Sequence, residues 1–164
     1  MDRLNIAIKA AVSGGNLLKE NYGKVAKEKQ KESFRDVVTE IDELSESTIL
    51  QIIEEHYPDD SLLTEESGFH DKNSEGMWII DALDGTVNYI HGIPLFCVSI
   101  AYWKNMHPEL GVIYNPLSGD IYYAQRGTGS FLNQVKLNTA LSTIEKNICL
   151  MAFSGKAHDP QNRL

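Results

Sequence analysis

Apolar positions in the first third of the chain recur at helical spacing. Between residues 4 and 21 they repeat every three or four positions, which predicts an amphipathic helix. A second repeat of the same kind predicts a helix that begins with Thr39 as its N-cap and runs to about Tyr57. The Gly14-Gly15 pair weakens the first helix, because glycine costs about 1 kcal/mol relative to alanine inside a helix. We expect this pair to allow close approach of another helix.

The remainder of the chain consists of short apolar runs separated by turn residues. These runs predict strands at residues 61–64, 77–80, 96–103, 110–114, 120–125, 130–132, 135–137 and 148–153. Tight turns between neighbouring runs favour antiparallel pairing, and the two helices are expected to cover one face of the sheet. The fold class predicted is therefore α+β, with two N-terminal helices packed on a largely antiparallel sheet.

Composition narrows the class of protein. The chain has 164 residues, 42% of them hydrophobic, and a net charge of −8. These values predict one soluble domain that does not bind nucleic acid, since nucleic-acid proteins usually carry a basic face. No apolar run is long enough to span a membrane, and no signal peptide is evident, so we expect a cytoplasmic protein. We interpret Cys97 and Cys149 as reduced core residues, although a disulfide between them is the alternative.

Candidate chemistry is concentrated after the apolar run at residues 77–80. Asp81 and Asp84 follow this predicted strand, three positions apart, and can converge on one cation or a close pair of cations. Gly85 allows a sharp bend, and the amides after it can begin a short helix that holds an anion. Carboxylates for a hard cation beside donors for a phosphate are what metal-assisted phosphate ester hydrolysis requires. The alternative is purely structural: an Asp-Gly turn followed by a helix cap.

Three motifs resemble those of the inositol monophosphatase family, the magnesium-dependent, lithium-sensitive sugar phosphatases. The segment Trp78–Pro94, WIIDALDGTVNYIHGIP, is similar to the family signature W-I-I-D-P-[IL]-D-G-T-x-N-[FY]-x-H-G-x-P. It departs at Ala82, where most members carry proline, and we expect a looser loop with unchanged chemistry. Residues 36–42, DVVTEID, match D-x-V-T-x-x-D, and residues 64–67, TEES, match G-E-E-S except at Thr64.

The resemblance implies a role for each matching residue. Magnesium would be held by Glu65, Asp81, Asp84 and the carbonyl of Leu83, and Asp84, Gly85 and Thr86 would bind the substrate phosphate. Catalysis would depend on Asp42, Thr86 and Glu65, with Asp42 and Thr86 orienting an attacking water. From the residues alone, Asp42 is a helix-start residue favoured by the dipole, and Glu65 and Glu66 are solvated glutamates.

The resemblance covers only the first part of the family. Residues 1–155 are expected to form the N-terminal α+β metal- and phosphate-binding domain, the first half of a layered αβαβα fold, and 156–164 a polar tail. The family's C-terminal α/β domain, with its W-D-x-A-A-G motif, is not found. We therefore expect an exposed apolar sheet face and a homodimer. Two functions stay open: a magnesium-dependent hydrolase of a small phosphorylated substrate, or a catalytically silent metal-binding or dimerising fragment.

Two further features have functional and structural interpretations. The basic stretch from Lys24 to Arg35 is either a solvated loop or a mobile flap that closes over the site. His70 and His91 are candidate ligands or proton carriers, but neither has a second His or Cys at metal-binding spacing. We interpret His91 as structural.

Overall fold

The computed structural model describes residues 2–24 and 34–138. The helices are α1 (Arg3–Asn21), α2 (Phe34–His56) and α3 (Thr86–Ile90). The strands are β1 (Ser61–Thr64), β2 (Phe69–His70), β3 (Gly76–Asp84), β4 (Cys97–Lys104), β5 (His107–Asn115), β6 (Asp120–Gln125), β7 (Gly129–Leu132) and β8 (Val135–Lys136). The predicted strand at 148–153 lies outside the described residues, as do Cys149 and residues 25–33 of the basic stretch.

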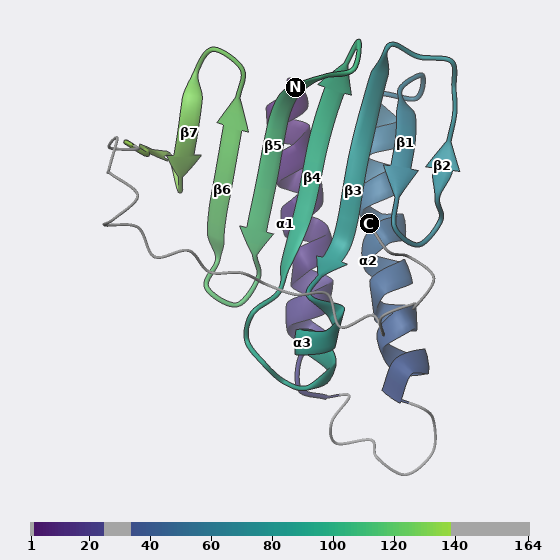
Figure 1. Ribbon diagram of the computed structural model, residues 1–164. Helices are drawn as coiled ribbons and strands as arrows, with labels where there is room; N and C mark the ends of the chain where they lie inside the picture. Colours follow the sequence, from purple (N-terminus) through teal and green to yellow (C-terminus); the bar gives the residue numbers. More distant parts are fainter. Residues whose placement is uncertain (1, 25–33, 139–164) are drawn as a thin grey trace, which may run out of the picture.

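One sheet joins the strands in the order β2-β1-β3-β4-β5-β6-β7-β8. Strands β1 and β3 pair in parallel, and the other neighbouring pairs among the described strands are antiparallel. Helices α1 and α2 lie side by side on one face of this sheet (Figure 1). The predicted α+β architecture, with two helices on a largely antiparallel sheet, is confirmed.

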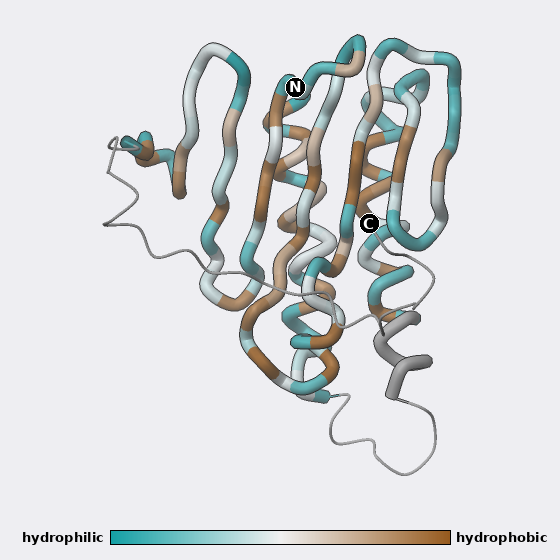
Figure 2. Tube along the Cα trace, in the orientation of Figure 1, coloured by the Kyte–Doolittle hydropathy of each residue, from teal (hydrophilic) through white to brown (hydrophobic). Residues whose placement is uncertain are grey.

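The core fills the space between the two long helices and the centre of the sheet. Figure 2 shows the hydrophobic segments concentrated in the central strands and the helices behind them. Gly14 and Gly15 explain how closely these layers approach. A Cβ on Gly14 would lie 2.7 Å from Ile49 of α2, and one on Gly15 would lie 2.6 Å from the ring of Tyr114 in β5. The expected close approach of a second helix is confirmed at Gly14, whereas Gly15 allows close approach of strand β5.

A buried polar cluster fixes the start of α1 to the sheet. The indole of Trp78 donates a hydrogen bond to Asp60 at 3.0 Å, and Arg3 pairs with the same carboxylate oxygen at 3.2 Å. The Arg3 guanidinium also lies over the rings of Tyr57 and Tyr102, 4.3 and 4.6 Å from their centroids. Because burying an unpaired carboxylate is costly, these partners let Asp60 lie in the core.

Several predicted boundaries were wrong: the strand predicted at 110–114 spans His107–Asn115, and the two-residue strand β2 was not predicted. Helix α2 begins at Phe34 and not at Thr39, because nothing between these residues stops a helix, and a threonine tolerates interior positions as well as caps. Strand β3 continues to Asp84 and does not end at Asp81. The pairing with β4 extends past the apolar run through a register shift, which periodicity alone does not reveal.

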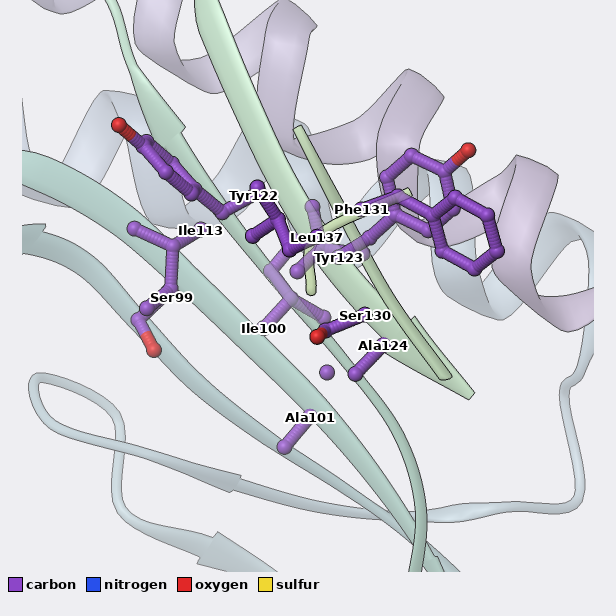
Figure 3. Close-up of a pocket in the computed structure, with 12 residues that line it drawn as sticks. Ser99, Ile100, Ala101, Ile113, Tyr122, Tyr123, Ala124, Ser130, Phe131 and Leu137 are labelled. Carbon is purple, nitrogen blue, oxygen red and sulfur yellow. The ribbon is translucent and has the colours of Figure 1, made fainter. Parts of the chain in front are cut away.

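The face of the sheet away from the helices exposes apolar side chains in the described part of the chain. Ile113 is 46% exposed and Tyr122 41%. Figure 3 shows both on one side of the strands, in a pocket of about 310 Å³ whose lining includes Ser130 and Leu137. The predicted exposed apolar face is confirmed, and the predicted homodimer remains a prediction. No helix within the described residues is long and apolar enough to cross a membrane.

Candidate active site

The parallel pairing of β1 and β3 brings the first carboxylates together. Thr64, the last residue of β1, lies opposite Ile80, so that Glu65 and Asp81 follow side by side at the same edge of the sheet. A parallel pair places the carboxyl ends of both strands at one edge. Residues separated by sixteen positions in the sequence therefore become neighbours in the fold.

A bulge separates the two aspartates of β3. Asp81 pairs with Ser99 and Asp84 with Cys97, so three steps along β3 match two along β4. The alternation of burial breaks at the same place, where Ala82 and Leu83 are buried in succession. Such bulges redirect side chains and are frequent beside active sites. Here the bulge leaves Asp81 half-buried and Asp84 exposed, although both belong to one strand.

Gly85 turns the chain from β3 into α3. Its φ of +96° lies in the left-handed region, and a Cβ would lie 2.8 Å from the carbonyl oxygen of Leu95. The expected sharp bend and short helix are therefore confirmed. Thr86 is the first residue of α3, and its hydroxyl donates to the Leu83 carbonyl at 3.0 Å.

The turn after β1 is held from within and from α2. The hydroxyls of Thr64 and Ser67 lie 3.0 Å apart, and the Thr64 amide donates to the Gly68 carbonyl at 2.9 Å. Glu46 of α2 accepts the amides of Glu66 and Ser67, each at 3.1 Å. Glu46 also accepts the hydroxyl of Ser67. The acidic turn, residues Glu65–Ser67, is thus attached to helix α2 through the buried carboxylate of Glu46.

Burial and mutual repulsion shift the carboxylates of this cluster. Burial, together with the negative charges of Glu66 and Asp81, raises the pKa of Asp42 to about 7. Burial, followed by the charges of Glu65 and Asp84, raises the pKa of Asp81 to about 6. The pKa of Glu66 is also raised, by burial and then by Glu65. The named charges acting on all three groups are negative, so the cluster has an excess of negative charge that a bound cation would relieve.

Comparison with known proteins identifies the family. The model of the inositol monophosphatase family matches residues 2–163. The chain belongs to this family. Members of this phosphatase-type family include Nus factor SuhB of Haemophilus influenzae, which is 43% identical over 136 residues, covering 82% of this chain and 51% of SuhB. The fructose-1,6-bisphosphatase/inositol-1-monophosphatase of Thermotoga maritima is 37% identical over 140 residues, covering 85% of this chain and 54% of that protein.

Solved structures of the family have the same fold. Extragenic suppressor protein SuhB of Bartonella henselae aligns with a TM-score of 0.75 at 33% identity, over 85% of this chain and 54% of that one. Inositol monophosphatase from Anabaena aligns with a TM-score of 0.72 at 36% identity, over 85% of this chain and 50% of that one. The chain therefore spans about half the length of the relatives that it matches.

The fold gathers several of the residues implied by the inositol monophosphatase motifs. Asp42, Glu65, Asp81 and Asp84 belong to one network of interacting charges. In the described part of the chain no three His, Cys, Asp or Glu side chains already stand together as a metal-binding group. Nor does a hydrogen bond join Asp42 to Thr86 among the described residues, since the Thr86 hydroxyl is donated to Leu83. The metal and catalytic assignments therefore remain predictions.

Three residues near the site were missed from the sequence. Glu46 holds the acidic turn, and the hydroxyl of Ser45 lies 3.5 Å from the Ala82 carbonyl. The thiol of Cys97 lies 3.6 Å from Asp84, and burial, with the nearby Asp84 charge, raises the pKa of this thiol to about 12. Of these three, only Glu46 could have been placed near the site from the sequence, because it follows Asp42 by four positions and so shares its helix face.

Proposed function

We propose that this chain forms the metal- and phosphate-binding part of a magnesium-dependent phosphomonoesterase that acts on a small phosphorylated substrate. The observation that carries the proposal is the placement of Glu65 beside Asp81 at one sheet edge, with Asp84 and the bend at Gly85 following on the same strand. Their donors are all oxygen atoms, which are the ligands that magnesium prefers. The unrelieved repulsion among these carboxylates also suits a divalent cation.

Magnesium would be held by Glu65, Asp81, Asp84 and the Leu83 carbonyl. Glu65 and Asp84 are exposed, so that their side chains can rotate towards an ion. The Leu83 carbonyl has a second lone pair in addition to the one that accepts the Thr86 hydroxyl. When bound, magnesium acts as a Lewis acid on phosphoryl oxygens and lowers the pKa of water.

The remaining groups bind the phosphate and direct the water. The amides of Gly85 and Thr86 lie at the start of α3, where backbone N–H groups have no partner within the helix. They would therefore donate to phosphate oxygens. Thr86 Oγ1 donates its proton to Leu83 and keeps its lone pairs for a water hydrogen. The Asp42 carboxylate would accept the proton of the attacking water as its oxygen bonds to phosphorus. The ester P–O bond would break, the alcohol would leave with a proton from solvent, and no covalent intermediate with the protein is required.

A second candidate function is a metal-binding or dimerising module without turnover. The exposed apolar face around Ile113 and Tyr122 favours it, because a face of this kind is typical of an interaction surface. Matching relatives include proteins named as phosphatases and proteins named as Nus factors, so family membership alone does not decide between the two functions.

Phosphate release by the purified 164-residue chain tests the proposal. Inositol 1-phosphate, fructose 1,6-bisphosphate and a nucleotide 3′-phosphate would be assayed with and without magnesium. We expect magnesium-dependent release that Asp84→Asn abolishes and Asp59→Asn, an exposed change of the same charge, leaves intact. Metal binding without phosphate release would contradict the enzyme proposal and support the silent module.

A further inference from the structure

Glu46 is a buried carboxylate that faces backbone donors. Glu46 is only 3% exposed, although it belongs to a helix with many solvated acidic residues. One oxygen accepts the Glu66 amide at 3.1 Å, and the other accepts the Ser67 amide at 3.1 Å and the Ser67 hydroxyl. Within residues 2–24 and 40–138 no lysine or arginine forms an ion pair with it. The hydrogen-bond donors described for the buried Glu46 carboxylate therefore come from the acidic turn itself.

This arrangement fixes the peptide that follows Glu65. A buried carboxylate without donors is costly, and hydrogen bonds to an ionised acceptor are stronger than neutral ones. On its other side Glu65 follows Thr64, which is held in β1 opposite Ile80. Both neighbours of Glu65 are thus held, while its own side chain is exposed. The direction in which the Glu65 side chain leaves the backbone is set by these two attachments.

The same turn of α2 also reaches the other carboxylate-bearing strand. Ser45, the neighbour of Glu46, lies with its hydroxyl 3.5 Å from the carbonyl of Ala82, between Asp81 and Leu83 in the bulge. Adjacent residues of one helix therefore contact both segments that carry the proposed ligands. A rigid helix in contact with both segments limits how far Glu65 and Asp81 can move apart.

We propose that Glu46 is a positioning residue that holds the Glu65–Ser67 turn in the geometry for metal binding. This inference rests on the proposed function, since it assigns Glu46 a role towards the magnesium that Glu65 would bind. Residues that orient metal ligands through hydrogen bonds typically change metal affinity by about 10- to 100-fold when they are replaced.

Glu46→Gln tests the role while keeping the side-chain shape. The glutamine side chain can accept hydrogen bonds only through its carbonyl oxygen, so its NH₂ group would face a backbone N–H donor of the turn. Binding of Mn²⁺ to the 164-residue chain would be measured by electron paramagnetic resonance, together with amide hydrogen exchange across residues 64–68. We expect Mn²⁺ affinity to fall by about tenfold and exchange in this turn to accelerate. Half-maximal phosphate release should require a higher magnesium concentration, whereas the rate at saturating magnesium should change less.

Two further variants separate positioning from charge and from folding. Glu43→Gln removes a charge that also raises the pKa of Glu66, but Glu43 is exposed and does not hold the turn. Its Mn²⁺ affinity should stay within about twofold of the parent chain. Ser67→Ala keeps the Glu46 charge and both amide bonds, and should weaken binding by less than Glu46→Gln while the fold is retained.

The outcomes distinguish the two proposals. A folded Glu46→Gln variant with unchanged Mn²⁺ affinity would overturn the positioning role and leave the proposed function standing. Equal losses in Glu43→Gln and Glu46→Gln would assign the effect to charge alone, and so would also overturn it. If Glu46→Gln does not fold, unchanged affinity in Ser67→Ala decides against the role. A parent chain that binds no Mn²⁺ would remove the proposed function and this inference together.

Discussion

The carboxylate cluster should destabilise the metal-free chain near neutral pH, and Asp42 is the residue with which to show it. Asp42 is only 6% exposed, and its pKa is raised from 3.8 to about 7 by burial and by the neighbouring negative charges. The folded chain therefore keeps a proton on Asp42 between about pH 4 and 7 that the unfolded chain has released. The free energy of unfolding should accordingly fall as the pH rises through this window.

The size of the effect follows from the change in proton affinity. At about 1.4 kcal/mol for each tenfold change, a rise in the Asp42 pKa from 3.8 to about 7 corresponds to about 4 kcal/mol lost above pH 7. Exposed neighbours such as Glu65 can rotate away and relieve part of the repulsion. We therefore expect Asp42→Asn, which removes the charge and keeps the shape, to stabilise the chain by about 2 kcal/mol at pH 8.

Urea denaturation followed by the fluorescence of Trp78 and Trp103 measures this difference. The gain from Asp42→Asn should be present at about pH 8 and absent at about pH 4, where the folded parent chain is already neutral at this position. Glu55→Gln is the matched control, an exposed change of the same charge on the same helix, and should shift stability by less than about 0.5 kcal/mol. Saturating magnesium at pH 8 should stabilise the parent chain.

Two results would refute this reasoning. One is an Asp42→Asn variant that is no more stable than the parent chain at pH 8. The other is a parent chain whose free energy of unfolding does not rise on acidification from pH 8 towards pH 5. Either would mean that Asp42 carries no unrelieved charge in the folded chain, and the electrostatic argument for a bound cation would be lost.

Two further predictions concern the core. Gly15→Ala should cost about 1–3 kcal/mol in thermal or urea unfolding, because its Cβ would lie 2.6 Å from the Tyr114 ring. Gly111→Ala, which has open space around its Cβ, is the control, and an equal cost there would contradict the packing argument. Asp60→Ala leaves Arg3 and the Trp78 indole without their shared acceptor and should cost about 3 kcal/mol or more by the same assay. A loss below about 1 kcal/mol would show that this cluster relaxes or takes up water.

Periodicity in the sequence predicted most of the secondary structure. The 4–21 helix and the strands through residue 137 other than β2 were found because apolar spacing reports directly on which face of an element is buried. Strand β2 was missed because it has only two residues and both are exposed. The hairpins at Asn115–Gly119 and Asn133–Gln134 were found because turn residues have local conformational preferences. The start of α2 was misplaced, since a capping pattern is short and compatible with the interior of a helix.

The sequence by itself determined which residues are suited to a metal and phosphate site. Asp81, Asp84 and Gly85 stand together in one motif, and carboxylate chemistry and backbone freedom are properties of the residues themselves. The tertiary structure decided which distant residues join them. Parallel pairing of β1 with β3 placed Glu65 beside Asp81, and α2 brought Asp42 and Glu46 to the same edge. The resemblance to family motifs had already pointed to Asp42 and Glu65. The contacts themselves depend on strand order and helix packing, which are set by interactions across the whole core and not by any one segment.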